Sequence, residues 1–300
     1  MRQRSTVVAK AGMPALAATA VAAVAFSVTI GAPFEERGGA QGPTAVSHQQ
    51  AAAEAAANDP SDPSTWRLPI EAYMPTRAQA QLIGTTREDQ IDVCMSDAGY
   101  ANWTPAPDLP EVGGKTLTDW RYGVHDAGLA AEYGYHPDAQ EQQAYDTAME
   151  AGAVDKSGAD QNVLESCVTQ AGNEIPPAGN ADLVQQISGD SYLKSEKAPS
   201  VVDVFAKWSS CMKEKGYSYA KPMDANDDPS FTDPTKVSKT EIATATADIE
   251  CRDKFNVEKT WFDAEVALQQ TAIARNRDAL DEAMTDIKSV VAKAKAAADR

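Results

Sequence analysis

The sequence CMSDAGY at residues 94–100 reappears as CMKEKGY at residues 211–217, with Cys-Met and Gly-Tyr at the same spacing. A further cysteine follows each copy, Cys167 after the first and Cys251 after the second, and these complete the four cysteines of the chain. A glycine shortly after a polar run is typical of a helix end, because glycine readily adopts the left-handed conformation. The doubled motif therefore predicts two related helical units, each with its own pair of cysteines.

The cysteines predict two structural disulfide bonds. The chain has no Cys-x-x-Cys pair, which argues against redox or zinc chemistry. Three pairings are possible for four cysteines. Pairing within each repeat, Cys94–Cys167 and Cys211–Cys251, is favoured because the motifs are related and each has one downstream partner. We expect the Met of each motif to pack beside the bridge and the Tyr to cover it.

The N-terminal residues predict export. Residues 1–12 carry three basic residues and no acid, and residues 13–34 carry no charge. A basic segment before an apolar one is the pattern of an export signal. Cleavage at Ala23-Val24-Ala25 and retention as a transmembrane anchor both stay open, since about 20 apolar residues span a bilayer. In either case we predict an extracytoplasmic protein, secreted or anchored to the membrane; without a nearby cysteine, no lipid attachment is expected.

The remaining residues are strongly acidic. The chain has a formal net charge of −17, and residues 1–34 contribute three positive charges, so residues 35–300 carry −20. Such a surface repels nucleic-acid phosphates and anionic lipids. We therefore predict no nucleic-acid partner, and membrane contact through the N-terminal segment if that segment is retained.

Composition divides the chain into four parts. Residues 1–34 form the signal peptide or anchor. Residues 35–65 contain few large apolar residues and are predicted to be a disordered linker, because they cannot bury enough apolar surface to offset their ordering entropy. Residues 66–172 and 173–300 form the two helical repeats, the second with a long C-terminal helix. The predicted fold class is all-α, since no useful strand-like alternation is present.

Capping residues and glycines predict where helices begin and end. Thr76 can cap the helix that ends at Gly99, and Ser200 can cap the helix that ends at Gly216. A seam between the repeats is expected at residues 173–179. The expected helices cover residues 76–98, 126–133, 137–151, 160–172 and 200–215, and then a region from 238 or 240 to 298 that Asn256 interrupts or merely marks.

The last helix permits two arrangements. Apolar residues recur every seven positions from 266 to 294, but the intervening stripe positions include Gln269, Asn276 and Arg277. A sustained coiled coil would need apolar residues at most of these positions. The first arrangement packs the helix on the domain core, and the second projects its last twenty residues into solvent, where they can self-associate.

Three residues are candidate ligands for a small molecule or a metal: His125, His136 and Asp126. Histidine titrates near neutrality and binds metals, but eleven residues separate these two and match no known ligand spacing. The loop at 224–235 begins like a calcium loop but has proline and threonine where glycine and glutamate are needed. No catalytic motif is present, so we predict no catalytic residue, no metal and no cofactor.

Further residue groups follow the cysteine motifs in order. Between the first motif and Cys167 stand Arg121-Tyr122-Gly123 and Gly134-Tyr135. The second half carries Trp208-x-x-Cys211-Met212, Ala247-Asp248-Ile249-x-Cys251 and the helix from Trp261. With these groups, most of residues 66–285 resembles a group of exported actinobacterial proteins, many of them lipoprotein-like, although this chain lacks the lipid-attachment cysteine. The resemblance implies export and an envelope location, and implies no activity.

These observations predict a non-enzymatic, exported cell-envelope protein with a binding or scaffolding role at the cell surface and an envelope protein as its partner. The alternative is an extracytoplasmic protein that binds a small ligand or a cell-wall fragment in a cleft between the halves. A wall hydrolase is the third interpretation, and converging carboxylates in such a cleft would favour it. We expect any working surface between the halves or along the last helix.

Overall fold

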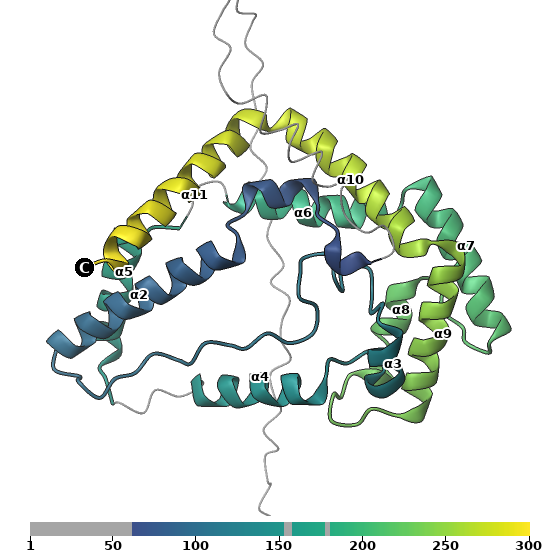
Figure 1. Ribbon diagram of the computed structural model, residues 1–300, viewed down its shortest axis with the longest axis horizontal. Helices are drawn as coiled ribbons and strands as arrows, with labels where there is room; N and C mark the ends of the chain where they lie inside the picture. The colour runs from purple at the N-terminus through teal and green to yellow at the C-terminus, as the bar shows by residue number, and fades with distance from the viewer. Residues whose placement is uncertain (1–61, 153–157, 178–180) are drawn as a thin grey trace, which may run out of the picture. The chain divides into compact units, whose positions relative to one another are not determined.

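The described part of the chain is helical throughout. The computed structural model describes residues 62–152, 158–177 and 181–300, and none of these residues forms a strand (Figure 1). The predicted all-α class is therefore confirmed. The predicted signal at 1–34 and all but the end of the predicted linker at 35–65 lie outside the described residues. Within the described ranges, no helix is both long enough and apolar enough to cross a membrane.

Most helices begin where the sequence predicts. Thr76 caps α2, Asp126 caps α3, Asp160 caps α5 and Ser238 caps α9, each by accepting a backbone N–H of the first turn. The elements are η1 (Pro63–Thr65), η2 (Pro69–Tyr73), α2 (Arg77–Asp97), α3 (Ala127–Tyr133), α4 (Ala139–Gly152), α5 (Gln161–Glu174), α6 (Ala181–Ser195), α7 (Pro199–Glu214), α8 (Pro222–Asn226), η3 (Pro229–Phe231), α9 (Lys239–Phe255), α10 (Val257–Arg275) and α11 (Arg277–Ala298).

Both copies of the doubled motif end a helix in the same way. The Tyr100 N–H donates to the Met95 carbonyl at 3.0 Å, and the Gly99 N–H donates to the Ser96 carbonyl at 3.0 Å. The second copy repeats both bonds, at 2.9 Å from the Tyr217 N–H and 3.1 Å from the glycine N–H. The two glycines have φ values of 96° and 94°. This is the Schellman arrangement, in which a left-handed glycine satisfies carbonyls of the last turn.

Both disulfides form the predicted pairs. Cys94 bonds to Cys167 and joins α2 to α5, and Cys211 bonds to Cys251 and joins α7 to α9. No cysteine is free. Since stable disulfides are typical of oxidising compartments, the two bonds indicate an extracytoplasmic environment.

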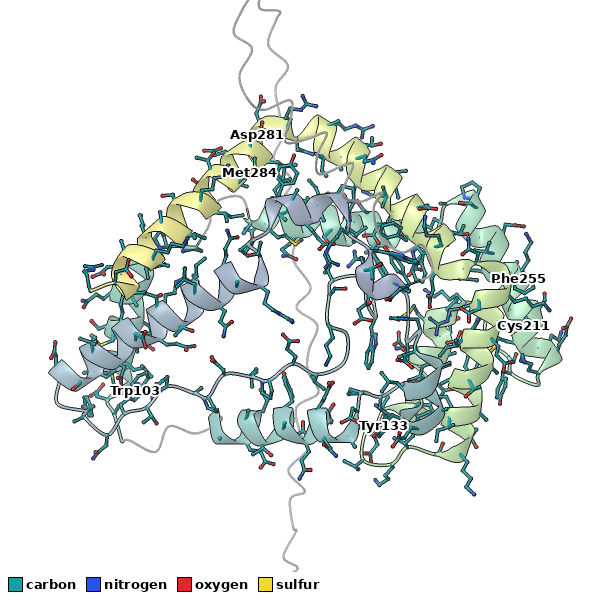
Figure 2. All side chains as sticks on the ribbon, viewed as in Figure 1. Trp103, Tyr133, Cys211, Phe255, Asp281 and Met284 are labelled. Atoms are coloured by element: carbon teal, nitrogen blue, oxygen red, sulfur yellow. A yellow bond between two sulfur atoms is a disulfide. The ribbon has the colours of Figure 1, made fainter. Side chains whose placement is uncertain are left out.

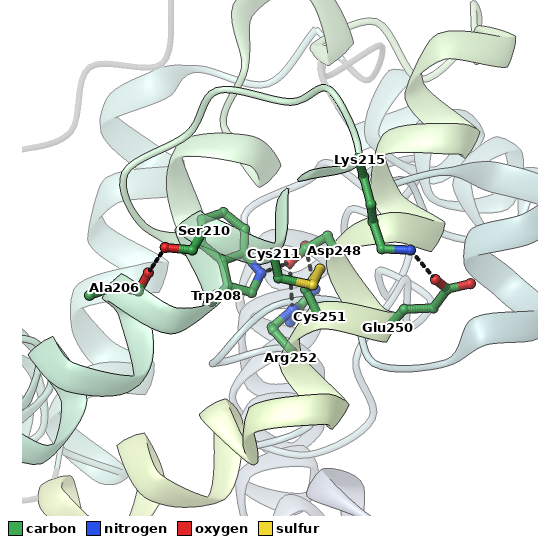
Figure 3. The surroundings of a disulfide bond; sticks show 9 residues. All are labelled: Ala206, Trp208, Ser210, Cys211, Lys215, Asp248, Glu250, Cys251 and Arg252. Carbon is green, nitrogen blue, oxygen red and sulfur yellow. Dashed lines mark hydrogen bonds and ion pairs between the residues drawn. A yellow bond between two sulfur atoms is a disulfide. The ribbon is translucent and has the colours of Figure 1, made fainter. Parts of the chain in front are cut away.

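The two bridges have different surroundings. Cys167 packs with Met95 and Trp103 in a small apolar cluster, and Tyr100 lies against it as predicted (Figure 2 labels Trp103). Its partner Cys94 is half-exposed. The second bridge lies in the main core, beside Trp208 and the charged residues of α9 that Figure 3 shows.

The main core takes residues from both halves of the chain. Trp66, Ile70 and Tyr122 belong to the first predicted repeat, yet they share one apolar cluster with Trp208 and Trp261 of the second. Tyr122 lies 5.3 Å from Trp261 between ring centroids. The disulfides thus close each half separately, while the largest apolar cluster joins the two halves.

Two expected helix boundaries are wrong by two residues each, and two short helices were not predicted. The helix that carries Cys167 continues past Gly172 to Glu174. The helix expected to be capped by Ser200 has Ala198 at that position, because Pro199 occupies the first turn, where its missing N–H costs nothing. The acidic loop after Tyr219 contains two short helices, α8 and η3.

The helix α6 has no counterpart in the sequence prediction. Its buried face includes Ser188, Ser191 and Ser195 beside two aliphatic residues. A stripe of serines lacks the apolar periodicity that indicates a buried helix face. Small side chains permit close packing on α10, where the Trp261 indole N–H donates to Ser195 Oγ at 2.7 Å.

The expected final helix is two helices that pack on the domain. Asn276 interrupts it, and the Asn276 side-chain amide donates to the Ala272 carbonyl at 2.8 Å. Figure 1 shows α11 alongside α2, and Val290 and Ala294 of α11 are buried against residues of α2 and Ile175. The packed arrangement is therefore confirmed, and the projecting one is wrong for these residues.

Candidate functional site

His125 and Asp126, two of the predicted ligand residues, have separate roles at the start of α3. His125 Nε2 lies 2.7 Å from Asp119 Oδ1. The other Asp119 oxygen accepts the backbone N–H of Lys115 at 2.5 Å, so this carboxylate organises its own loop. Asp126 accepts two backbone N–H groups of the first turn of α3, at 2.7 and 3.0 Å. Asp126 is therefore a helix cap.

His136, the third predicted ligand residue, lies near a different acid. Its Nε2 is 3.4 Å from Glu241 Oε1, at ion-pair distance but without hydrogen-bond geometry. Glu241 is buried and accepts the Tyr135 N–H at 3.2 Å. Across the described residues, no three His, Cys, Asp or Glu side chains converge as a metal site would require. The three predicted residues thus do not form one site.

The buried polar groups are organised around Arg252 of α9. Arg252 Nε and Nη2 donate to the two oxygens of Asp248 at 2.9 and 2.6 Å, a bidentate pair. Nη1 donates to Glu258 Oε1 at 2.7 Å, and two further bonds reach the carbonyls of Tyr122 and Val124 at 3.0 and 2.7 Å. These five bonds match the five donors of a guanidinium group. Arg252 therefore ties the 122–124 loop to α9 and α10.

Asp248 completes the network from the opposite side. Its Oδ1 accepts the Trp208 indole N–H at 2.9 Å (Figure 3), and its Oδ2 accepts the Tyr135 hydroxyl at 3.2 Å. Burial raises the pKa of Asp248 and also that of Tyr135. One carboxylate thus connects α7, α9 and Tyr135, which lies two residues after the end of α3.

Glu258 is the second carboxylate on the same guanidinium. Burial raises its pKa to about 7, although Arg252 and His125 oppose the shift. A single cation facing two carboxylates leaves one negative charge in excess when both are ionised. Burial thus favours the protonated form of Glu258 in this network.

A second buried ion pair joins Arg121 to Glu265 of α10. Arg121 donates from Nε to Oε2 at 2.9 Å and from Nη2 to Oε1 at 2.7 Å. The Tyr122 hydroxyl donates to the same Oε2 at 2.7 Å, and the Gln269 amide donates to Oε1 at 2.9 Å. Gln269 in turn accepts the Ile70 N–H at 3.0 Å. The first half of the chain is thereby held on α10 by hydrogen bonds.

Two glycines of the sequence motifs lie directly against these charged side chains. A Cβ at Gly123, where φ is 109°, would lie 2.1 Å from Arg252 Nη1. A Cβ at Gly134, where φ is 63°, would lie 2.6 Å from Glu241 Oε1. Arg121-Tyr122-Gly123 and Gly134-Tyr135 are therefore docking segments: the tyrosine bonds a buried carboxylate, and the glycine makes room for a buried charge.

The centres of these networks are closed to ligands. Asp248, Arg252, Glu265 and Gln269 are each exposed by 2% or less. The carboxylates of Asp248 and Glu265 accept several protein donors and are fully buried, so they stabilise the arrangement of helices and are not accessible to a substrate. Their role is to fix the fold around which accessible surfaces are built.

An accessible groove lies elsewhere, between η2, the start of α2, the 114–117 loop and α11. We call it the α11 groove. It has a volume of about 940 Å³ and takes its walls from both halves of the chain. Its apolar lining includes Leu68, Met74, Leu117, Met284 and Ile287.

The charge of the α11 groove is opposite to that of the chain. Its lining has four basic residues, Arg67, Arg77, Lys115 and Lys288, and one acidic residue, Glu71. Residues 35–300 as a whole carry −20. Burial raises the pKa of Glu71, opposed by its bond from the Leu68 N–H and by nearby arginines. Cations in a concave site attract anions more strongly than the same cations on a flat, solvated surface.

Sequence reasoning placed a working surface between the halves or along the last helix, and the α11 groove lies at both. It did not identify the residues, because the four cations come from positions 67 to 288 and share no local pattern. No tryptophan is among the residues that line the groove, and Trp66, which lies next to the lining residue Arg67 in sequence, is buried in the main core.

Comparison of the chain with protein-family models, with curated proteins and with solved structures finds no significant match to any of them.

Proposed function

We propose that this protein is a non-enzymatic, exported cell-envelope protein with a binding or scaffolding role at the cell surface, and that it holds an envelope protein in the α11 groove. The observation that carries the proposal is the groove itself: a concave, cationic and partly apolar surface on an acidic chain. The disulfides support the extracytoplasmic location.

The residues in the groove favour binding over chemistry. Its one acidic lining residue, Glu71, accepts the Leu68 backbone N–H at 2.7 Å and is thus used by the turn. Glycoside hydrolysis in its usual form needs two carboxylates that flank the scissile bond. A wall hydrolase is therefore the weakest of the three interpretations.

Binding of a small ligand or a wall fragment is the second candidate. The observation that favours it is the groove volume of about 940 Å³, which falls within the usual range of small-molecule sites. It would use the same residues, so the two candidates differ in what the groove holds.

The test is capture from a native envelope extract by the purified, disulfide-bonded chain. Lys288→Glu reverses one charge in the groove, and Lys293→Glu is the matched control, an exposed lysine of the same helix outside the groove. We expect the wild-type chain and Lys293→Glu to retain the same envelope protein and Lys288→Glu to lose it. Retention of purified wall fragments without any protein would favour the second candidate, and release of soluble fragments from the wall would favour the hydrolase.

A further inference from the structure

We infer that the α11 groove recognises an acidic, partly apolar peptide segment, such as an extended stretch of a partner protein in which carboxylates alternate with aliphatic side chains. The inference rests on the proposed binding function and specifies the chemistry of the partner. It follows from the arrangement of charges, from the apolar floor and from the rigidity of the walls.

The rim cations are available to an incoming carboxylate. Lys288 makes no ion pair with any described residue. Lys115 pairs with Glu141 at 2.6 Å and Arg67 with Glu71 at 3.9 Å, and the side chains of both basic residues are more than 40% exposed. Exposed pairs of this kind contribute little net stability, so a ligand carboxylate can replace the protein partner at low cost.

Arg77 is likewise an exposed cation whose ion pair a ligand carboxylate can replace. It pairs with Glu111, and the side chain of Arg77 is 62% exposed. It begins α2, so its position along the groove is set by the capped end of that helix. The rim thus presents cations from four separate segments of chain, which suits a ligand with several negative charges along its length.

The floor requires a ligand that is also apolar. Leu117 is 38% exposed, and Met284 and Ile287 of α11 line the same groove (Figure 2 labels Met284). An inorganic anion would leave these side chains uncovered. A flat bilayer cannot reach the floor of a concave site, whereas an extended peptide can lie in it with alternate side chains on the floor and at the rim.

The walls are held by hydrogen bonds from uncharged groups, and Arg67 Nη1 also donates to the Trp66 carbonyl at 2.7 Å. Thr116 Oγ1 donates to the Ser64 carbonyl at 3.0 Å, and Thr118 Oγ1 donates to the Trp66 carbonyl at 2.8 Å. The Ile70 N–H of η2 donates to the buried Gln269. A preorganised groove costs little ordering entropy when a ligand binds.

The probe is a fluorescent octapeptide of alternating Glu and Leu or Ala residues, and the control peptide has Gln in place of Glu. Binding to the purified full chain is followed by fluorescence anisotropy in low and high salt. We expect the acidic peptide to bind, the Gln peptide to bind at least tenfold more weakly, and salt to weaken the acidic complex.

Variants assign binding to the groove. We expect Lys288→Gln to weaken binding of the acidic peptide about threefold, as for exposed charge pairs. The double variant with Arg77→Gln should weaken it about tenfold. Lys293→Gln should leave the affinity for the acidic peptide unchanged, and Leu117→Ser should weaken the binding of both peptides. Circular dichroism melts of each variant check that the fold is intact, since all four positions are exposed.

Equal binding of the two peptides, or equal loss in Lys288→Gln and Lys293→Gln, would overturn the inference. The inference would also be overturned if the chain does not bind the peptide but binds vesicles of phosphatidylglycerol and phosphatidylcholine in a way that depends on Lys288. If envelope capture depends on Lys288 but the acidic peptide does not bind, the peptide class is wrong and the proposed function stands. If the peptide binds but no envelope protein is captured, the groove chemistry stands and the proposed role fails.

Discussion

The contact between Gly123 and Arg252 gives a stringent test of how the two halves are joined. We predict that Gly123→Ala destabilises the protein far more than backbone strain alone would do. The new Cβ would lie 2.1 Å from Arg252 Nη1 and would displace the guanidinium group. That group makes the bonds to Asp248, Glu258 and two loop carbonyls.

The magnitude follows from two separate costs. An alanine in the left-handed region costs about 1–2 kcal/mol. Disrupting a buried ion pair by removing its partner costs about 3–5 kcal/mol. We therefore expect Gly123→Ala to lower the free energy of unfolding by at least about 4 kcal/mol, which for a domain of this size is about 8–16 °C in melting temperature.

Gly99→Ala is the matched control. Its φ of 96° is close to the 109° of Gly123, but a Cβ at Gly99 would meet no atom within 4 Å. We expect Gly99→Ala to lower the free energy of unfolding by about 1–2 kcal/mol, which is the cost of the backbone strain alone. Urea unfolding followed by circular dichroism measures both variants. Equal losses in the two would refute the conclusion that Arg252 is packed against Gly123.

Three further outcomes are expected. Mild dithiothreitol should reduce Cys94–Cys167 before Cys211–Cys251, because Cys94 is half-exposed and the second bridge is buried. Alkylation and mass spectrometry would show the order of reduction, and the reverse order would contradict the packing. The free energy of unfolding should fall by on the order of 1–3 kcal/mol as the pH rises from about 4.5 to about 7. The reason is that the raised pKa of Glu258 makes the native state bind more protons than the unfolded state in that window. Glu258→Gln should flatten this pH profile, measured by urea unfolding. Gly189→Ala should stabilise the protein by about 0.5–1 kcal/mol, since a Cβ within α6 meets no atom there and alanine favours a helix; a lower midpoint of urea unfolding would count against it.

The predicted ligand residues show the limit of local reasoning. Sequence proximity and the chemistry of histidine and aspartate make His125, His136 and Asp126 one predicted ligand group. In the structure each has a different partner: His125 contacts Asp119, His136 lies near Glu241, and Asp126 caps the first turn of α3. The residues that organise the interior, Arg252 and Glu265, look from sequence like ordinary charges on helices. Their partners lie 128 to 144 positions away, and no local pattern reveals them.

The sequence by itself determined the helical class and the helix ends at Gly99 and Gly216, and it favoured the cysteine pairing that the structure shows. These follow from short-range chemistry: caps, left-handed glycines and one partner cysteine for each motif. Only the tertiary structure decided that α11 packs on α2, that a serine-lined α6 is buried, and that four distant cations meet in one groove. The physical reason is that packing faces and surface charges become neighbours through contacts between distant segments, which periodicity and spacing along the chain do not encode.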